Sequence, residues 1–190
     1  MTVPAERSPA RLIHRFARPF AFPRGIIPGF VSAIVGTTLI HLWPGFELHV
    51  LAQGAARLSA FFCGSPVLLQ AEGFAVPAAH VPVIVTTDCS AADFFCIVAA
   101  LVSWQLAPFF PRNGVTIAIG LAAALPLTIL VNAVRILTVA QAHRWLIPQF
   151  PDAYAPFLHL TTGVAVFLPS LITLKLLLEY YGHRYTAARH

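Results

Sequence analysis

Long apolar stretches separated by short polar ones run through most of the chain. Residues 26–43, 90–110, 115–140 and 157–181 each carry very few charged side chains. A helix of about 18–20 such residues crosses a hydrocarbon core of about 30 Å. Proline and glycine occur in the breaks, as in the predicted turn at residues 111–114. The pattern therefore predicts four transmembrane helices.

The stretch at residues 46–63 has a different pattern. Its apolar side chains keep a helical spacing, but Glu47, Gln53 and Arg57 interrupt it. Burying an arginine in the middle of a bilayer costs about 2.5–3.5 kcal/mol. We therefore expect an amphipathic helix that lies along the outer surface of the membrane, and not a fifth span.

The segment at residues 64–88 shows a β-like pattern. Two apolar runs, at residues 67–70 and 81–86, flank a turn region with glycine and proline at residues 72–77. Pro82 cannot donate a ladder hydrogen bond, which restricts the second run to an edge strand. The expected fold class is thus an all-α integral membrane protein with about four transmembrane helices, an outer-face amphipathic helix and a small extracytoplasmic β-hairpin.

The composition also indicates a lipid environment. Hydrophobic residues make up 58% of the 190 residues and charged residues only 10%, whereas soluble domains carry about 25% charged residues. The net charge of +5 does not indicate nucleic acid, because the basic residues flank apolar stretches and form no run interleaved with aromatics. We expect membrane lipid, and no nucleic acid, among the partners.

The placement of the basic residues orients the four spans. Cytoplasmic loops of membrane proteins carry the excess of Lys and Arg. With both termini in the cytoplasm, three basic residues lie outside (Arg57, Arg135 and Arg144) and nine lie inside (Arg7, Arg11, Arg15, Arg18, Arg24, Arg112, Lys175, Arg184 and Arg189). This bias predicts a multi-pass protein of the cell or inner membrane with both ends in the cytoplasm.

One domain is expected for a chain of this length. Residues 1–25 form a basic cytoplasmic segment, residues 26–181 a single transmembrane domain, and residues 182–190 a cytoplasmic tail. The first apolar stretch lacks a convincing small-residue cleavage site and is interpreted as an anchor. The three cysteines (Cys63, Cys89 and Cys96) form no CxxC pair and no Cys/His metal pattern, so we expect neither a metal nor a cofactor.

Three reactive side chains fall at one level of the membrane in this arrangement. Cys89 ends the second β-like run and directly precedes the second span. Arg135 lies 21 residues past Gly114, about 32 Å along a helix that rises 1.5 Å per residue, and so emerges near the outer face. His159 lies at the start of the last span. The sequence therefore predicts one outer-facing site built from three helices.

These groups form a coherent set for acyl transfer. A cysteine attacks as its thiolate, which a nearby cation stabilises. His159 could take the thiol proton and later return it to a leaving amine. Arg135 could stabilise the oxyanion of a tetrahedral intermediate.

Three further polar residues lie close to this set in the sequence. Asn132 shares a helix face with Arg135, so it could orient the guanidinium or donate to a substrate. Asp88 and Asp93 flank Cys89. A carboxylate there opposes thiolate formation unless Asp93 pairs with Arg135.

Each reactive residue also has an ordinary structural interpretation. A lone cysteine usually packs as a small hydrophobic residue, and an arginine near the end of a span usually extends to the interface. A histidine at a helix start often just lies at the membrane surface. Cys63 and Cys96 are given only the structural interpretation.

The ordered motifs favour the functional interpretation. Asp88-Cys89-Ser90-Ala91, then Asn132-Ala133-Val134-Arg135-Ile136, then His159 followed by Gly163 together resemble the exosortase/archaeosortase family. That family carries Cys-Ser-Gly, Asn-x-x-Arg-Ile and a single histidine in this order on separate membrane helices. The match covers about residues 65–180. The chain departs at Ala91, where the family usually has glycine, and it has fewer spans than the larger bacterial members.

The resemblance implies a function. Members of this family cleave C-terminal sorting signals of exported proteins, near a transmembrane helix followed by a basic cluster, and pass the protein to another anchor. By resemblance, Cys89 is the nucleophile, Arg135 the transition-state or substrate-binding group, and His159 the acid/base. We expect a cysteine peptidase/transpeptidase that acts on such exported proteins at the outer membrane face.

Other classes of function remain open on the sequence alone. A non-enzymatic small membrane assembly or transport subunit is the alternative. A haem- or quinone-linked protein fits less well, because no two histidines share a span with bis-ligand geometry. A thiol oxidoreductase is disfavoured by the absence of a CxxC arrangement, although a Cys63–Cys89 disulfide is conceivable.

Overall fold

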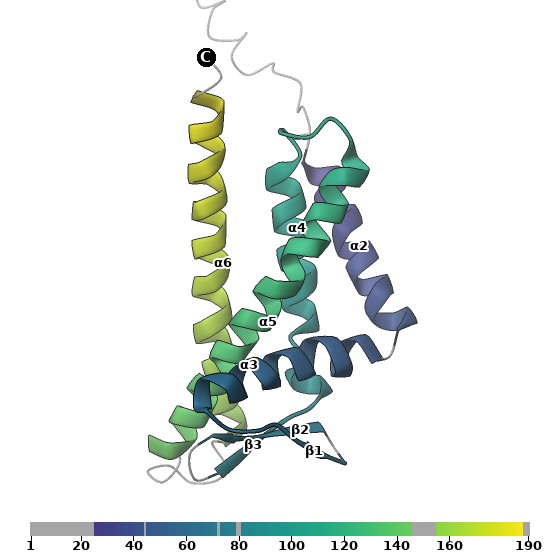
Figure 1. Ribbon diagram of the computed structural model, residues 1–190. Helices are drawn as coiled ribbons and strands as arrows, with labels where there is room; N and C mark the ends of the chain where they lie inside the picture. The colour runs from purple at the N-terminus through teal and green to yellow at the C-terminus, as the bar shows by residue number, and fades with distance from the viewer. Residues whose placement is uncertain (1–24, 44, 72, 79–80, 146–154, 188–190) are drawn as a thin grey trace, which may run out of the picture.

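The computed structural model describes residues 25–43, 45–71, 73–78, 81–145 and 155–187 (Figure 1). Within them the fold is mostly helical, as predicted. Its five α-helices are α2 (Ile26–Leu42), α3 (Gln53–Cys63), α4 (Ala92–Leu106), α5 (Asn113–Trp145) and α6 (Ala155–Ala187). Three short strands accompany them: β1 (Leu68–Gln70), β2 (Gly73–Ala78) and β3 (Val81–Val85). The predicted basic segment lies outside the described residues, except for Gly25.

Three helical segments are long and apolar enough to cross a membrane: Thr87–Leu106, Asn113–Ala142 and Leu160–Gly182. They match three of the four predicted spans. Helix α2 has 17 residues, about 25 Å, and qualifies only as a pair with Phe46–Cys63, from which it is bent by 111°. The structure therefore supports a multi-pass membrane protein with three or four spans.

Several predicted boundaries shift. Helix α4 ends at Leu106, before the predicted end of the second span at residue 110, whereas α5 and α6 continue through their predicted ends. Helix α5 runs to Trp145 and α6 begins at Ala155, so the loop expected at residues 141–156 is shorter. Helix α6 also continues past the predicted span as far as Ala187. Pro126 and Pro169 both lie inside helices. Membrane helices tolerate proline because neighbouring helices can satisfy the backbone groups that it leaves without a hydrogen bond.

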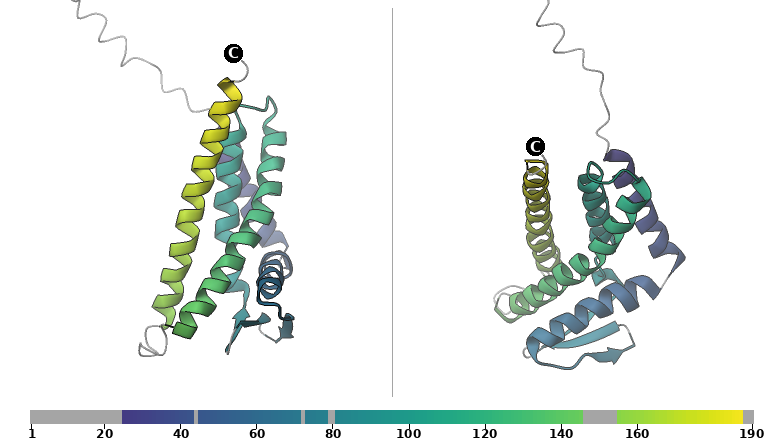
Figure 2. Two further views of the ribbon diagram at one scale, coloured as in Figure 1. Left: turned by 60° about the vertical axis from the view of Figure 1, so that its left-hand side comes forward. Right: turned by 45° about the horizontal axis from the view of Figure 1, so that its top comes forward.

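The stretch predicted as an amphipathic helix is helical. A π-helical segment (Phe46–Ala52) runs directly into α3, which lies crosswise to α4 and α6 and beside the sheet (Figures 1 and 2). Its alanines and Ser59 are buried, whereas Arg57 is exposed. The helix ends at Gly64, which adopts the left-handed conformation common after a helix.

The predicted two-stranded hairpin is wrong in its middle, where a turn was expected. Residues 73–78 form β2, the central strand of an antiparallel sheet with the order β1-β2-β3. Strand β1 pairs only with residues 73–75, so no backbone N–H is required of Pro77 on the β1 side. On the other side Pro77 lies opposite Pro82 of β3. Burial of Phe74 and Val76 against α3 stabilises the strand. Pro82 does lie in an edge strand, as expected.

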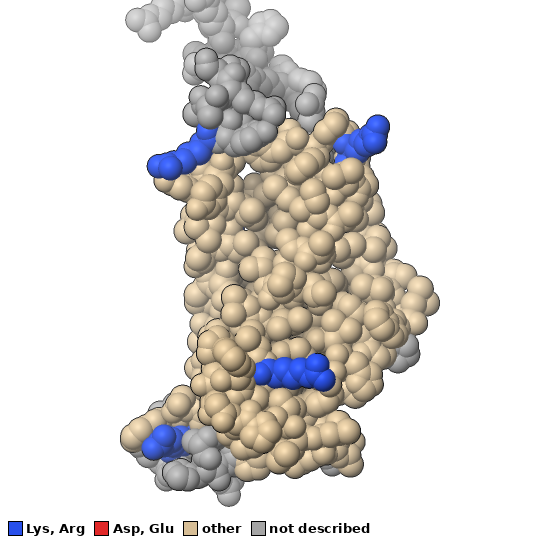
Figure 3. All heavy atoms as spheres, viewed as in Figure 1, with Lys and Arg blue, Asp and Glu red and all other residues tan. Residues whose placement is uncertain are grey.

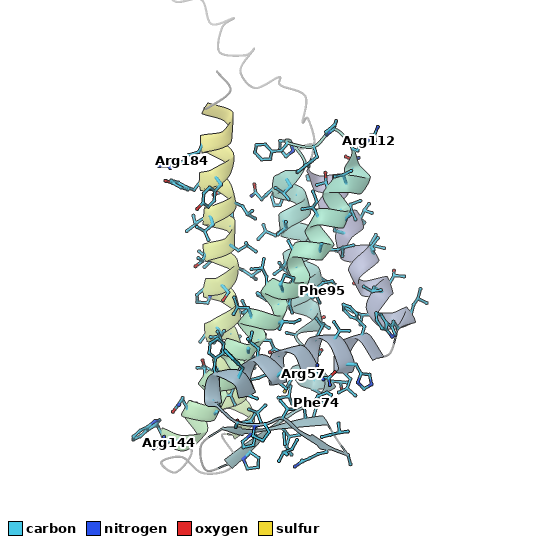
Figure 4. The ribbon with its side chains drawn as sticks, in the orientation of Figure 1. Arg57, Phe74, Phe95, Arg112, Arg144 and Arg184 are labelled. Carbon is cyan, nitrogen blue, oxygen red and sulfur yellow. The ribbon has the colours of Figure 1, made fainter. Side chains whose placement is uncertain are left out.

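Two apolar clusters form the core. One, which contains Phe74, lies between the sheet, α3 and the last part of α5. The other, which contains Phe95, joins α4 and α5, and side chains of α6 pack against it. Figure 4 shows both phenylalanines in place. The first cluster fixes the end of β3 relative to α5, and this is where Cys89 lies.

The basic side chains lie toward the two ends of the molecule. Figure 3 shows Lys and Arg separated by an uncharged band on the drawn face. Arg112 and Arg184 lie at the end where α2 begins and α6 ends, and Arg57 and Arg144 lie toward the end with the sheet (Figure 4). This separation is typical of a protein whose middle faces lipid.

Candidate active site

Cys89 lies in a tight turn between the sheet and α4. Strand β3 ends at Val85, and Thr87–Cys89 form one 3-10 turn. The Cys89 N–H donates to the Thr86 carbonyl at 3.1 Å, and the Ser90 N–H donates to the Thr87 carbonyl at 2.9 Å. The Cys89 side chain is partly buried and packs against the cluster beneath α3. The β-like run thus delivers the thiol to the start of a candidate span, as predicted.

Ala91 turns the chain into α4 through a left-handed conformation. Its φ of 60° and ψ of 34° cost a residue with a Cβ roughly 1–2 kcal/mol. It is the only non-glycine residue with positive φ in the described part of the chain. This is also the position where the resemblance expects glycine, which adopts such a conformation freely. The chain therefore keeps a glycine-like turn after Cys89 without the glycine.

Asn132 ties α5 to this turn. Its side chain is fully buried, and Nδ2 donates to the Cys89 carbonyl at 2.6 Å. We expected this amide to orient Arg135 or to donate to a substrate; one of its two N–H donors is used by the Cys89 carbonyl. Its Oδ1 is buried and has no hydrogen-bond partner among the described residues.

Arg135 lies one helical turn beyond Asn132 and faces α6. It is only 9% exposed, and its guanidinium carbon lies 5.3 Å from the ring centroid of Phe167. That ring stacks on Phe94 of α4, with centroids 4.7 Å apart and planes at 22°. A cation over an aromatic face is attracted by the ring electrons. The two phenylalanines therefore support the guanidinium from α6 and α4.

Gly163 lets α6 approach the arginine. A Cβ at this position would lie 3.2 Å from Arg135 Nε, closer than side chains normally pack. The predicted residue His159 precedes Gly163 by four positions in α6, and residues four apart share a helix face. Its helix position is thus on the face that meets Arg135, while its side chain lies outside the described part of the structure.

The aspartates do not join the group. Asp88 and Asp93 are both exposed, and neither forms an ion pair within the described residues. The pairing of Asp93 with Arg135, which would have offset its negative charge, is therefore absent from the described part of the chain. Cys63 is exposed at the end of α3, and the conceivable Cys63–Cys89 disulfide is not formed.

A groove lies beside the arginine between α5 and α6. Its volume is about 350 Å³, and apart from Arg135 it is lined by Gly163 and apolar side chains such as Leu160, Val164 and Phe167. An extended or helical apolar segment could lie in it with a backbone carbonyl near the guanidinium. The groove thus combines a cation with an apolar path, whereas the Cys89 side chain packs against the cluster of α3 and the sheet.

The sequence-based prediction missed the aromatic support. Phe167 follows Gly163 by four positions, as Gly163 follows His159, so this spacing on one face of a helix was the available signal. Nothing in the sequence singled out Phe94.

No protein-family model matches the chain, and neither the curated proteins nor the solved structures include one significantly similar to it.

Proposed function

We propose that the chain is a membrane-embedded cysteine peptidase/transpeptidase that resembles the exosortase/archaeosortase family. The observation that carries the proposal is the hydrogen bond from Asn132 to the Cys89 carbonyl. It joins the Asn-x-x-Arg-Ile motif to the cysteine motif in space, with Arg135 one turn further along α5. Motifs 43 residues apart meeting in this way favour a common site over independent packing roles.

The proposed reaction is acyl transfer in two steps. The Cys89 thiol loses its proton to His159, and the thiolate attacks a backbone carbonyl of the substrate. Arg135 stabilises the oxyanion that forms. The C–N bond then breaks, the leaving amine takes the proton from His159, and the substrate remains as a thioester on Cys89. An acceptor nucleophile releases it with transfer to a new anchor.

The site is assigned to the extracytoplasmic face. The turn with Cys89, the sheet and α3 lie at the end of the molecule opposite the start of α2 and the end of α6 (Figure 1). The nine-to-three distribution of basic residues puts those chain ends in the cytoplasm. Substrates would then be exported proteins, held by a C-terminal transmembrane helix.

The groove beside Arg135 supports such a substrate. It lies between two candidate spans and is almost entirely apolar, so a substrate helix could reach it sideways from the lipid. Docking of that helix would fix the scissile bond relative to Cys89, which lowers the entropy cost of reaction.

The test uses exported reporter proteins that end in an apolar span and a basic cluster, expressed together with the full-length chain. Cys89→Ala and Cys89→Ser should leave the reporter uncleaved in the membrane, because serine lacks the reactivity of a thiolate without a stronger base. Cys63→Ala and Cys96→Ala are the matched controls and should cleave normally.

Immunoblotting of the reporter in membranes with equal amounts of each variant gives the measurement. Normal cleavage by Cys89→Ala would end the peptidase proposal and favour the non-enzymatic assembly or transport subunit.

A further inference from the structure

A second groove lies at the other end of the molecule, away from the Cys89 turn. It has a volume of about 580 Å³ and runs between the end of α4 and the last turns of α6. Leu106, Phe109, Phe110 and Leu178 supply apolar walls, and Gln105 and Arg184 are among its polar lining residues. Its size falls in the range of roughly 300–1,000 Å³ that small-molecule sites occupy.

The charge around this groove is positive. Arg184 is exposed, and its guanidinium carbon lies 4.7 Å from the ring centroid of Tyr180, which holds the cation close to α6. Glu179 forms an ion pair with Lys175 at 3.1 Å and does not line the groove. On the face drawn in Figure 3 this end shows basic but no acidic side chains.

We propose that the groove binds an anionic phospholipid. An acyl chain would lie along the apolar walls between α4 and α6, and the phosphate would meet Arg184, with the Gln105 amide as a further donor. The charge complementarity selects an anionic over a zwitterionic headgroup. Because both helices belong to candidate spans, the groove is open to lipid along its length. This site does not depend on the peptidase proposal.

The experiment places the full-length protein in phosphatidylcholine nanodiscs with a trace of photoactivatable phosphatidylglycerol. Cross-links should map to residues 105–110 and 178–184. Unlabelled phosphatidylglycerol should displace the probe, whereas phosphatidylcholine with the same acyl chains should not. Water-soluble glycerophosphate should not compete, because it lacks the acyl chain.

Arg184→Gln should weaken labelling about fivefold, the effect of one cation near an anionic lipid surface. Arg112→Gln is the matched control: Arg112 is exposed at the same end but does not line the groove, so labelling should persist. Leu178→Trp should fill the groove and block labelling; its folding is checked by helicity and elution volume.

Three results would overturn the proposal. Equal displacement by phosphatidylcholine would show a groove filled by any lipid. An equal loss in Arg112→Gln would show attraction by the surface charge as a whole. Unchanged labelling of a folded Leu178→Trp variant would place the lipid elsewhere.

Discussion

The two sides of α5 are packed in different ways. Toward α4 the contacts include small side chains: Ser103 of α4 donates to the Thr116 carbonyl of α5 at 3.4 Å, and its hydroxyl oxygen lies 2.6 Å from that of Ser32 of α2, with both serines fully buried; we call this the small-residue seam. Toward α6 the contacts near the candidate site are large, with Arg135 over Phe167 beside Gly163; we call this the arginine seam. Only 6% of the α6 span is buried, against 39% of the α4 span.

We expect this difference to separate a scaffold from a movable part. Small residues let helix backbones approach closely, which membrane helices use for tight association. The small-residue seam therefore holds α4 and α5, and with them Cys89 and Asn132, in fixed relation. The arginine seam leaves a groove open, so under the proposed function we expect α6 to shift when a substrate helix docks. The proposed acid/base, His159, belongs to α6.

Arg135→Lys gives the strongest test of the arginine seam. Lysine keeps the charge but loses the planar fork and its stacking on Phe167. If Arg135 stabilises an oxyanion, turnover should fall on the order of 100- to 1,000-fold. The measurement is the rate of reporter cleavage at equal amounts of folded protein. Near-normal turnover would reduce Arg135 to a structural role.

Gly163→Leu should displace α6 from Arg135, because even a Cβ at this position would lie 3.2 Å from the arginine Nε. A misplacement of about 1 Å can cost up to about 100-fold in rate, so we expect a loss of roughly 10- to 100-fold. Ala165→Leu, on an exposed position of the same helix, should change cleavage little. Equal effects of the two variants would mean that the close approach of α6 does not matter.

Ser103→Ala should act in the opposite way, on stability and not on turnover. It leaves the buried Ser32 hydroxyl without its partner, which should lower the free energy of unfolding by about 1 kcal/mol. Ser170→Ala removes only a bond within α6, to the Val166 carbonyl, and should cost less. Unfolding in mixed micelles gives both free energies. A clear fall in turnover of folded Ser103→Ala, with its free energy of unfolding unchanged, would refute the division into scaffold and movable part.

Ala91→Gly has the smallest expected effect. Glycine relieves the left-handed strain at φ 60°, so the free energy of unfolding should rise by about 1 kcal/mol. Ala118→Gly, at an exposed position inside α5, should instead lower it by roughly 0.5–1 kcal/mol. A fall in both variants would exclude the left-handed turn after Cys89.

The apolar pattern was sufficient for the helices because lipid imposes a simple length requirement. The crosswise α3 and the position of Cys89 before α4 followed from charge and length. The break predicted at residues 111–114 lies earlier, because α4 ends at Leu106 and α5 already begins at Asn113. Strand β2 did not, because Gly73 and Pro77 look like turn residues locally. The strand depends on burial of Phe74 against α3, a contact that no local pattern contains.

The sequence predicted the depth in the membrane at which the candidate site residues lie, but not which side chains contact one another. Helix rise puts Arg135 near the level of Cys89, but it does not fix the rotation of α5 about its axis. That rotation decides that Asn132 meets the Cys89 carbonyl and that Arg135 meets Phe167. The role of Phe94 depends on the packing of three helices, which the sequence of any one of them cannot specify.

The order of synthesis follows from the bond between Asn132 and the Cys89 carbonyl. Its donor leaves the ribosome 43 residues after its acceptor, and Ile136, which helps to close the cluster under α3, follows still later. The sheet and the cysteine turn therefore remain unfinished until α5 has been inserted, and Gly163 and Phe167 arrive only with the last helix. A nascent chain would thus carry the Cys89 thiol without its neighbours on α5 and α6 during insertion, and the proposed site would form only after α6 has been added.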